Sequence, residues 1–171
     1  MFSVCDINRV EKYKQGWRSG LPETECGSGS RIKDTEKQRE WMPKIIRKYN
    51  IQTIADIGAG DLNWITKTDL SGAEYQGYDL VPRHGSVKQF DLVNEIPPAV
   101  DLIMCLWVLN HFPFDDCRAA LKNLKASGAK YLMMTDRPDW HGTQPPEIQT
   151  KPLESIVILN EPEAHIKMIA L

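Results

Sequence analysis

"TIADIGAGDLNW", residues 53–64, is the stretch that decides the fold of this 171-residue chain. A short apolar run carries Asp56 and ends at Gly58 and Gly60, which stand one residue apart. Glycines at this spacing allow a tight turn, and they let a ligand come close to the backbone after a strand. The stretch therefore predicts a strand followed by a ligand-binding turn. The alternative is a turn whose glycines are purely structural.

Three kinds of ligand bind such turns: a dinucleotide, a phosphate group or another adenosine ligand. A dinucleotide turn requires a third glycine three residues after Gly60, and the chain has Asn63 there. A phosphate-binding loop requires Gly-Lys-Ser or Gly-Lys-Thr, and this triplet does not occur. Asp56 and Asp61 place negative charge on both sides of the turn, which disfavours a pyrophosphate and suits a cationic amine. The turn therefore favours a different adenosine ligand.

The composition is typical of one globular domain, with 42% hydrophobic and 26% charged residues. The net charge of -2 provides no bulk positive field, so a nucleic-acid partner is disfavoured. No apolar run reaches the length of a membrane span, and the first residues contain no apolar signal core. The four cysteines lack metal-ligand spacing. We therefore expect a cytoplasmic protein with neither a membrane segment nor a metal site.

Apolar runs along the chain predict a largely parallel sheet. The predicted strands are 51–57, 74–80, 87–92, 100–109, 130–136, 155–161 and 165–171, the last two forming an antiparallel hairpin. Helical spacing predicts one helix from Asp34, with Thr35 and Gln38 as a capping box and Pro43 as a kink or break. A second predicted helix covers residues 115–128.

We therefore expect a single α/β domain over residues 1–171. Its fold class is a Rossmann-like, mostly parallel sheet with helices on both faces and an antiparallel C-terminal hairpin. Residues 51–171 form the predicted core, and residues 1–50 form a loop and helix that cover the site.

Acidic residues follow the predicted strands where a ligand would bind, because ligands of open α/β sheets lie beyond the carboxyl ends of the strands. Asp79 ends the second strand and can accept both hydroxyls of a ribose, the alternative being a surface turn. Asp91 ends the third predicted strand and can accept a hydrogen bond from the amino group of an adenine. The alternative is that Asp91 only caps the end of the strand. The fourth predicted strand contains Trp107 near its end and is followed by Asn110 and His111.

Residues 53–136 resemble the class I S-adenosylmethionine-dependent methyltransferases, whose first strand ends in a D-x-G-x-G pattern, matched here by residues 56–60. The resemblance implies S-adenosylmethionine as cofactor, with the glycine turn at its methionine part, Asp79 at the ribose and Asp91 near the adenine. The cofactor-binding residues predicted on this basis are Ser28, Gly29, Ser30, Asp56, Gly58, Gly60, Asp79, Leu80, Asp91, Leu92 and Trp107.

Residues 27–136 also resemble a set of short bacterial and viral methyltransferase-domain proteins. The shared features are a GSGS-x4-T segment at residues 27–35, a GD-x-N-W turn and a histidine after the fourth strand. Ser28 and Ser30 are expected to donate hydrogen bonds to the cofactor's carboxylate, the alternative being a flexible linker. This chain departs from the set at Ala59, where a cysteine is common, and at Leu106 and Trp107, where relatives often have Arg-Asp.

His111 and Asn110 are the predicted catalytic residues. The imidazole of His111 has an ordinary pKa suited to accepting a proton near neutrality, the alternative being a capping role. The predicted function is methyl transfer to an O- or N-acceptor, a small molecule or a glycan-type compound, and the sequence leaves open whether the chain forms an oligomer. The alternatives are a non-catalytic or S-adenosylmethionine-consuming binding protein, and a nucleotide-dependent oxidoreductase that Asn63 disfavours.

Overall fold

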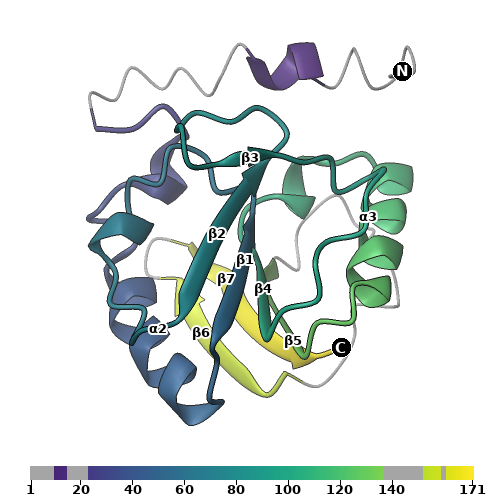
Figure 1. Ribbon diagram of the computed structural model, residues 1–171. Helices are drawn as coiled ribbons and strands as arrows, with labels where there is room; N and C mark the ends of the chain where they lie inside the picture. Colours follow the sequence, from purple (N-terminus) through teal and green to yellow (C-terminus); the bar gives the residue numbers. More distant parts are fainter. Residues whose placement is uncertain (1–9, 15–22, 137–151, 159–160) are drawn as a thin grey trace.

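The computed structural model describes residues 10–14, 23–136, 152–158 and 161–171 (Figure 1). These residues form a seven-stranded sheet with strand order β3-β2-β1-β4-β5-β7-β6. The strands are β1 (Thr53–Ile57), β2 (Glu74–Asp79), β3 (Lys88–Gln89), β4 (Leu102–Cys105), β5 (Tyr131–Asp136), β6 (Glu154–Ile158) and β7 (Glu161–Ala170). The first five strands are parallel, whereas β7 is antiparallel to both β5 and β6. The predicted fold class is therefore confirmed.

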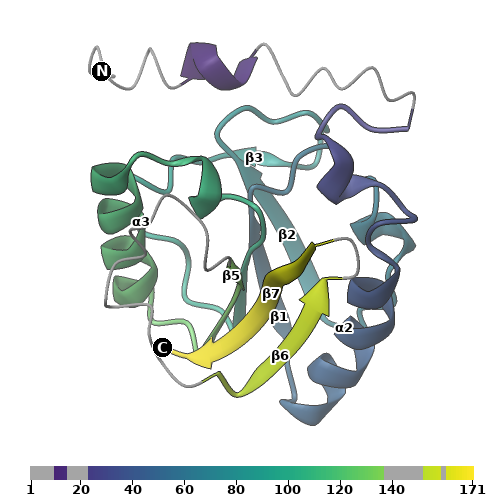
Figure 2. The same cartoon turned by 180° about the vertical axis from the view of Figure 1, so that it is seen from behind.

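Two helices cover opposite faces of the sheet, α2 (Glu36–Lys48) on one and α3 (Phe114–Ala126) on the other (Figures 1 and 2). The same strands can pack against both helices, because successive side chains of a strand point to opposite faces of the sheet. In β4, Leu102 and Met104 pack with the apolar residues of α2, whereas Ile103 and Cys105 pack with those of α3. All of β4 is buried, as expected for a central parallel strand.

The N-terminal end of α2 differs from the prediction. The hydroxyl of Thr35 donates to the backbone oxygens of Arg31 and Ile32, and its side chain makes no cap hydrogen bond. The predicted capping box is therefore wrong, because the preceding turn already engages the threonine hydroxyl. The helix also runs unbroken through Pro43.

Several predicted strand boundaries also differ from the structure, most of all at β3, which covers Lys88–Gln89 instead of 87–92, and at β4 and β7. β4 ends at Cys105, because the chain leaves the sheet at Trp107, whose φ of 59° is left-handed, and enters a short 3-10 helix (Leu109–His111). The backbone N–H of Trp107 donates to the hydroxyl of Thr135 instead of to a neighbouring strand. Residues 162–164, expected between the last two strands, belong to β7, as does Glu161, which was expected to end the preceding strand.

The strand order positions the site. Successive connections lead from β1 through β2 to β3 in one direction, whereas β4 and β5 lie on the other side of β1. The crevice between the carboxyl ends of β1 and β4 is therefore the topological switch point, where ligands of such sheets bind. In the described part of the chain, no helix is long and apolar enough to span a membrane.

Candidate functional site

A cavity of about 430 Å³ lies at the carboxyl ends of β1, β2 and β4. Its size falls within the usual range for small-molecule and cofactor sites, roughly 300 to 1,000 Å³. All thirteen residues predicted to bind the cofactor or to act in catalysis line this one cavity: Ser28, Gly29, Ser30, Asp56, Gly58, Gly60, Asp79, Leu80, Asp91, Leu92, Trp107, Asn110 and His111. The structure thus brings the predicted residues together, whereas their individual roles remain predictions.

The turn after β1 requires glycine at two positions. Gly58 and Gly60 have φ angles of 84° and 60°, which are left-handed. A Cβ on Gly58 would lie 2.2 Å from Cγ2 of Val108, and one on Gly60 would lie 2.5 Å from Sγ of Cys26. The turn is therefore enclosed by the loop after β4 and by the N-terminal segment, which leaves no room for a side chain.

Asp56 presents a buried carboxyl group on the cavity wall. Its residue is 5% exposed, and the hydroxyl of Tyr75 donates to Oδ2 at 2.6 Å. Burial raises the pKa of this carboxyl from 3.8 to about 7, while the Tyr75 hydrogen bond opposes the rise and the charge of Asp79 adds to it. A cationic group in the cavity would stabilise the ionised form. The site is thus suited to an amine, as the sequence predicts.

Asp79 links the end of β2 to the glycine turn. Its Oδ2 accepts from the backbone N–H of Gly60 at 2.9 Å, and its Oδ1 accepts from that of Val81 at 3.0 Å. Burial raises the pKa of Asp79, and these backbone hydrogen bonds oppose the rise. Each carboxylate oxygen has a second lone pair, so the fixed side chain can still accept from a ligand's hydroxyls.

Asp91 and its neighbours form a closed local turn after β3. Its Oδ1 accepts from the backbone N–H of Val93, and its Oδ2 accepts from the side chain of Asn94 at 2.9 Å. The carboxylate therefore acts as a strand-end cap while lining the cavity. Leu92 is buried in the core on the α3 side, and Leu80 is half-buried at the end of β2.

The GSGS segment is held against the glycine turn by the residues that follow it. The Asn63 side chain donates to the backbone oxygen of Ser30 at 2.9 Å. Asp61 accepts from the hydroxyl of Thr24 at 2.7 Å and from the backbone N–H of Glu25 at 2.9 Å. These contacts give Asn63 and Asp61 a structural role, because they position the 24–30 segment on the cavity wall.

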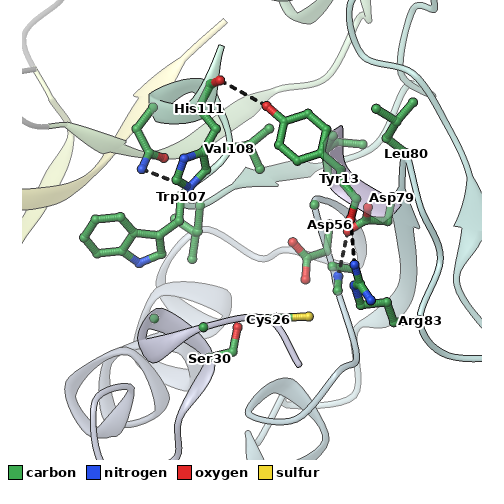
Figure 3. Close-up of a pocket in the computed structure, with 18 of the residues that line it drawn as sticks. Tyr13, Cys26, Ser30, Asp56, Asp79, Leu80, Arg83, Trp107, Val108 and His111 are labelled. Carbon is green, nitrogen blue, oxygen red and sulfur yellow. Dashed lines mark hydrogen bonds between the residues drawn. The ribbon is translucent and has the colours of Figure 1, made fainter. Parts of the chain in front are cut away.

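A helical turn at residues 10–14 also lies on the cavity (Figure 3). The hydroxyl of Tyr13 donates to the backbone oxygen of His111 at 3.0 Å. Arg83 donates to the backbone oxygen of Tyr13 at 2.8 Å and pairs with Glu25 at 3.2 Å. Sequence reasoning missed Tyr13 and Arg83, because no local pattern marks contacts between residues so distant in the chain.

The loop after β4 contributes Trp107 and His111 to another wall of the cavity, on the side away from Asp79 and Arg83 (Figure 3). A Cβ on Gly29 would lie 3.2 Å from Cδ1 of Trp107, so the indole packs on the GSGS segment. The left-handed backbone of Trp107 is an outlier for a bulky residue. Such strain is maintained where the surrounding structure enforces it, often at functional sites.

Asn110 and His111 interact with each other. The side-chain nitrogen of Asn110 lies 3.3 Å from Nε2 of His111, and the side-chain oxygen of Asn110 is buried without a hydrogen-bond partner among the described residues. Burial, followed by the charge of Lys12, lowers the pKa of His111 to about 4. The imidazole is therefore neutral at pH 7 and is a weaker base than the sequence predicts.

Gln38 is a cavity residue that sequence reasoning assigned to the wrong role. It is 5% exposed and lines the cavity, and its side chain makes no hydrogen bond with the described residues. The spacing of Gln38 from Met42, Ile45 and Ile46 could have indicated its burial, because residues at this spacing share one face of a helix. A polar residue on a buried face is expected to find a hydrogen-bond partner, and a ligand can supply one.

No protein-family model matches this chain, and no curated protein matches it in sequence. Solved structures match its fold. Magnesium protoporphyrin IX methyltransferase from Synechocystis PCC 6803 with bound S-adenosylmethionine has 14% identity and a TM-score of 0.62, over 99% of both chains. The N-methyltransferase NodS from Bradyrhizobium japonicum WM9, in complex with S-adenosylhomocysteine, has 13% identity and a TM-score of 0.63, over 96% of this chain and 97% of that one.

An rRNA methylase from Escherichia coli has 12% identity and a TM-score of 0.60, over 99% of this chain and 77% of that one. These proteins differ in what they methylate, so the likeness describes the fold and leaves the acceptor open. The chain therefore has the fold of the class I S-adenosylmethionine-dependent methyltransferases.

Proposed function

We propose that the chain binds S-adenosylmethionine in this cavity and transfers its methyl group to an O- or N-acceptor, a small molecule or a glycan-type compound. The observation that carries the proposal is the convergence of the glycine turn, Asp79 and the GSGS segment on one cavity at the topological switch point. Structures of the same fold hold S-adenosylmethionine or S-adenosylhomocysteine.

The methionine arm of the cofactor would lie between the glycine turn and the GSGS segment. Asp56 would accept from its amine, because a cation stabilises the ionised form of this buried carboxyl. Ser28 and Ser30 would donate to its carboxylate, and the carboxamide of Gln38 would find in the same arm the partner it lacks among the described residues.

The nucleoside would extend along the carboxyl ends of β2 and β3. The carboxylate of Asp79 would accept from the ribose hydroxyls with its remaining lone pairs. Leu80 and Leu92 would provide apolar contacts to the adenine, with Asp91 beside its amino group. The loop after β4 would then face the reactive end of the cofactor.

When bound, S-adenosylmethionine supplies a methyl group that its sulfonium already activates. The chain's part is to hold the acceptor in line with that group and to exclude water. Asn110 would orient the acceptor, and the neutral imidazole of His111 would take up the proton that it releases. Because burial makes this imidazole a weak base, orientation is the larger contribution.

Calorimetric titration with S-adenosylmethionine and S-adenosylhomocysteine tests the first half of the proposal. Asp79→Asn should weaken both affinities by about tenfold to a hundredfold, because hydrogen bonds to a charged group contribute roughly 1.5 to 3 kcal/mol. Asp69→Asn is the matched control, since Asp69 is an exposed aspartate that does not line the cavity. The absence of affinity for either compound would refute the proposal.

Radiolabelled S-adenosylmethionine incubated with a metabolite extract tests the second half. Labelled product that disappears in Asn110→Ala would support transfer to an acceptor. Tight cofactor binding without any labelled product would instead support the non-catalytic alternative.

A further inference from the structure

Tyr75 contacts the cavity wall from outside the cavity. It lies on β2 beside Ile54 of β1, on the face of the sheet that α2 covers, and it is not among the described residues of the lining. Its hydroxyl donates to Oδ2 of Asp56 at 2.6 Å. Any part that Tyr75 has in ligand binding therefore acts through Asp56.

The second oxygen of Asp56 is open to the cavity. Oδ1 accepts no hydrogen bond from the described residues, whereas Oδ2 is engaged by Tyr75. In the described part of the chain, two side-chain atoms are both buried and unpartnered, Nε of Arg39 and Oδ1 of Asn110. Oδ1 of Asp56 is not one of them, so it retains exposure. The space that it meets is the cavity, which Asp56 lines (Figure 3).

Tyr75 is a fixed donor to this carboxyl group. Burial, followed by the charge of Asp56 and the hydrogen bond to it, raises the pKa of the tyrosine, so the hydroxyl keeps its proton near neutral pH. A donated hydrogen bond favours the ionised form of a carboxyl group. It also restrains the orientation of the group, so that Oδ2 is engaged and Oδ1 is left for a ligand in the cavity.

Resting on the proposed function, we propose that Tyr75 is a positioning residue of the cofactor site, whose hydroxyl orients Asp56 so that Oδ1 receives the ammonium group of the methionine arm. Tyr75 itself does not touch the cofactor in this arrangement. An ammonium group pairs with an ionised carboxylate, so a protonated Asp56 gives up its proton to solvent when the cofactor binds. Tyr75 keeps its own proton throughout.

The pH dependence of cofactor affinity follows from this arrangement. Burial raises the pKa of Asp56 to about 7, so the free chain carries part of a proton there near neutrality. Below that pH the cofactor must displace the proton, and its affinity falls as the pH falls. Between pH 7 and pH 6 the ionised fraction falls from about one half to about one tenth, so affinity should fall about fivefold. The α-amino group of the ligand stays cationic at these pH values.

Each strand or helix beside Asp56 contributes a group that faces it or the cavity. On β2, the charge of Asp79 raises the pKa of Asp56, and the hydrogen bond from Tyr75 opposes this effect. On β4, burial raises the pKa of the Cys105 thiol above its usual range, so the thiol stays neutral. On α2, the neutral carboxamide of Gln38 lines the cavity.

The loops around the cavity add four groups that keep their charge state between pH 6 and pH 7. Burial lowers the pKa of His111 to about 4 and raises that of Cys26 to about 12. Arg31 and Arg83 remain cationic, and each forms an ion pair with another carboxylate.

Two ligands that differ only in the amine test the inference on the full chain. They are S-adenosylhomocysteine and its deaminated analogue, in which hydrogen replaces the amino group. Calorimetric titration should show the advantage of S-adenosylhomocysteine over the analogue increasing about fivefold from pH 6 to pH 7. Its binding at pH 6 should release most of one proton, measured from the heats in buffers of different ionisation enthalpy. Comparing the two ligands cancels the pH effects of groups that contact both, whichever part of the chain supplies them.

Tyr75→Phe should weaken S-adenosylhomocysteine about fivefold at pH 7 and leave the analogue unchanged, because loss of the hydrogen bond makes Asp56 about tenfold less acidic. Tyr78→Phe is the matched control, since Tyr78 lies on the same strand, packs against Phe90 on the α3 side and does not line the cavity. It should change neither affinity. Asp56→Asn should abolish both the proton release and the difference in pH dependence between the two ligands.

The same pH profile for both ligands, or a profile that Tyr75→Phe leaves unchanged, would overturn the inference. Should Tyr75→Phe fail to fold, loss of the proton release in Asp56→Asn supports the inference and its persistence overturns it. If the unmodified chain binds S-adenosylhomocysteine at neither pH, the proposed function itself is wrong.

Discussion

Gly58→Ala is expected to destabilise the chain strongly and to disturb the cofactor site. Two costs arise from the structure. The φ of 84° is left-handed, which costs roughly 1 to 2 kcal/mol for a residue with a Cβ. The new Cβ would lie 2.2 Å from Cγ2 of Val108, whereas carbon atoms normally approach to about 3.5 Å.

The overlap must be relieved by movement of the loop after β4. Overpacking of this kind typically costs about 1 to 3 kcal/mol, so the expected loss in the free energy of unfolding is about 2 to 5 kcal/mol. This is a large part of the roughly 5 to 15 kcal/mol by which domains are stable. Movement of Val108 also displaces the adjacent Trp107, so affinity for S-adenosylhomocysteine should fall.

Urea denaturation of matched variants separates the two costs. Gly72 has nearly the same φ, 85°, but a Cβ there meets nothing within 4 Å, so Gly72→Ala measures the backbone cost alone. The Gly58→Ala/Val108→Ala double variant should recover much of the steric cost after correction for Val108→Ala. If Gly58→Ala costs no more than Gly72→Ala, the reasoning about enclosure by Val108 is wrong.

Three further changes test separate parts of the site. Gln38→Leu should leave the free energy of unfolding nearly unchanged, because the carboxamide faces the cavity, while affinity for S-adenosylhomocysteine falls several-fold. Asp56→Asn should flatten the pH dependence of stability between about pH 4 and pH 7. Because burial raises the pKa of this carboxyl from 3.8 to about 7, the folded chain binds more protons than the unfolded chain in that window, and the stability contribution of Asp56 falls as the pH rises through it. Tyr13→Phe should increase the dissociation rate of S-adenosylhomocysteine in stopped-flow measurements, because it removes the hydrogen bond that fastens residues 10–14 to His111.

Each of these predictions has a contrary outcome. Gln76 is the matched control for Gln38, because its carboxamide donates to Gly77 and Ser86 and lies outside the cavity lining. Gln76→Leu should lower stability and leave ligand affinity unchanged, and the same result for Gln38→Leu would show a structural role. A pH profile unaltered by Asp56→Asn would mean that other groups produce it. An unchanged dissociation rate in Tyr13→Phe would show that residues 10–14 do not retain the ligand.

Local features of the sequence were sufficient to predict the sheet, its two helices and the glycine turn after β1. Apolar runs mark buried parallel strands, because such strands are covered on both faces. The glycines at 58 and 60 mark the turn, since few other residues adopt its backbone. The acidic residues after β1, β2 and β3 converge, because the carboxyl ends of parallel strands meet at one edge of the sheet.

Only the tertiary structure decided how the cavity is enclosed and what its polar groups contact. The hydrogen bond between Tyr13 and His111 joins residues 98 positions apart, and that between Thr24 and Asp61 joins residues 37 apart. Periodicity and spacing report on backbone conformation over a few residues, whereas such contacts depend on the path of the whole chain. The same distinction explains Gln38, which sequence alone paired with nearby Thr35 and which packing directs to the cavity wall.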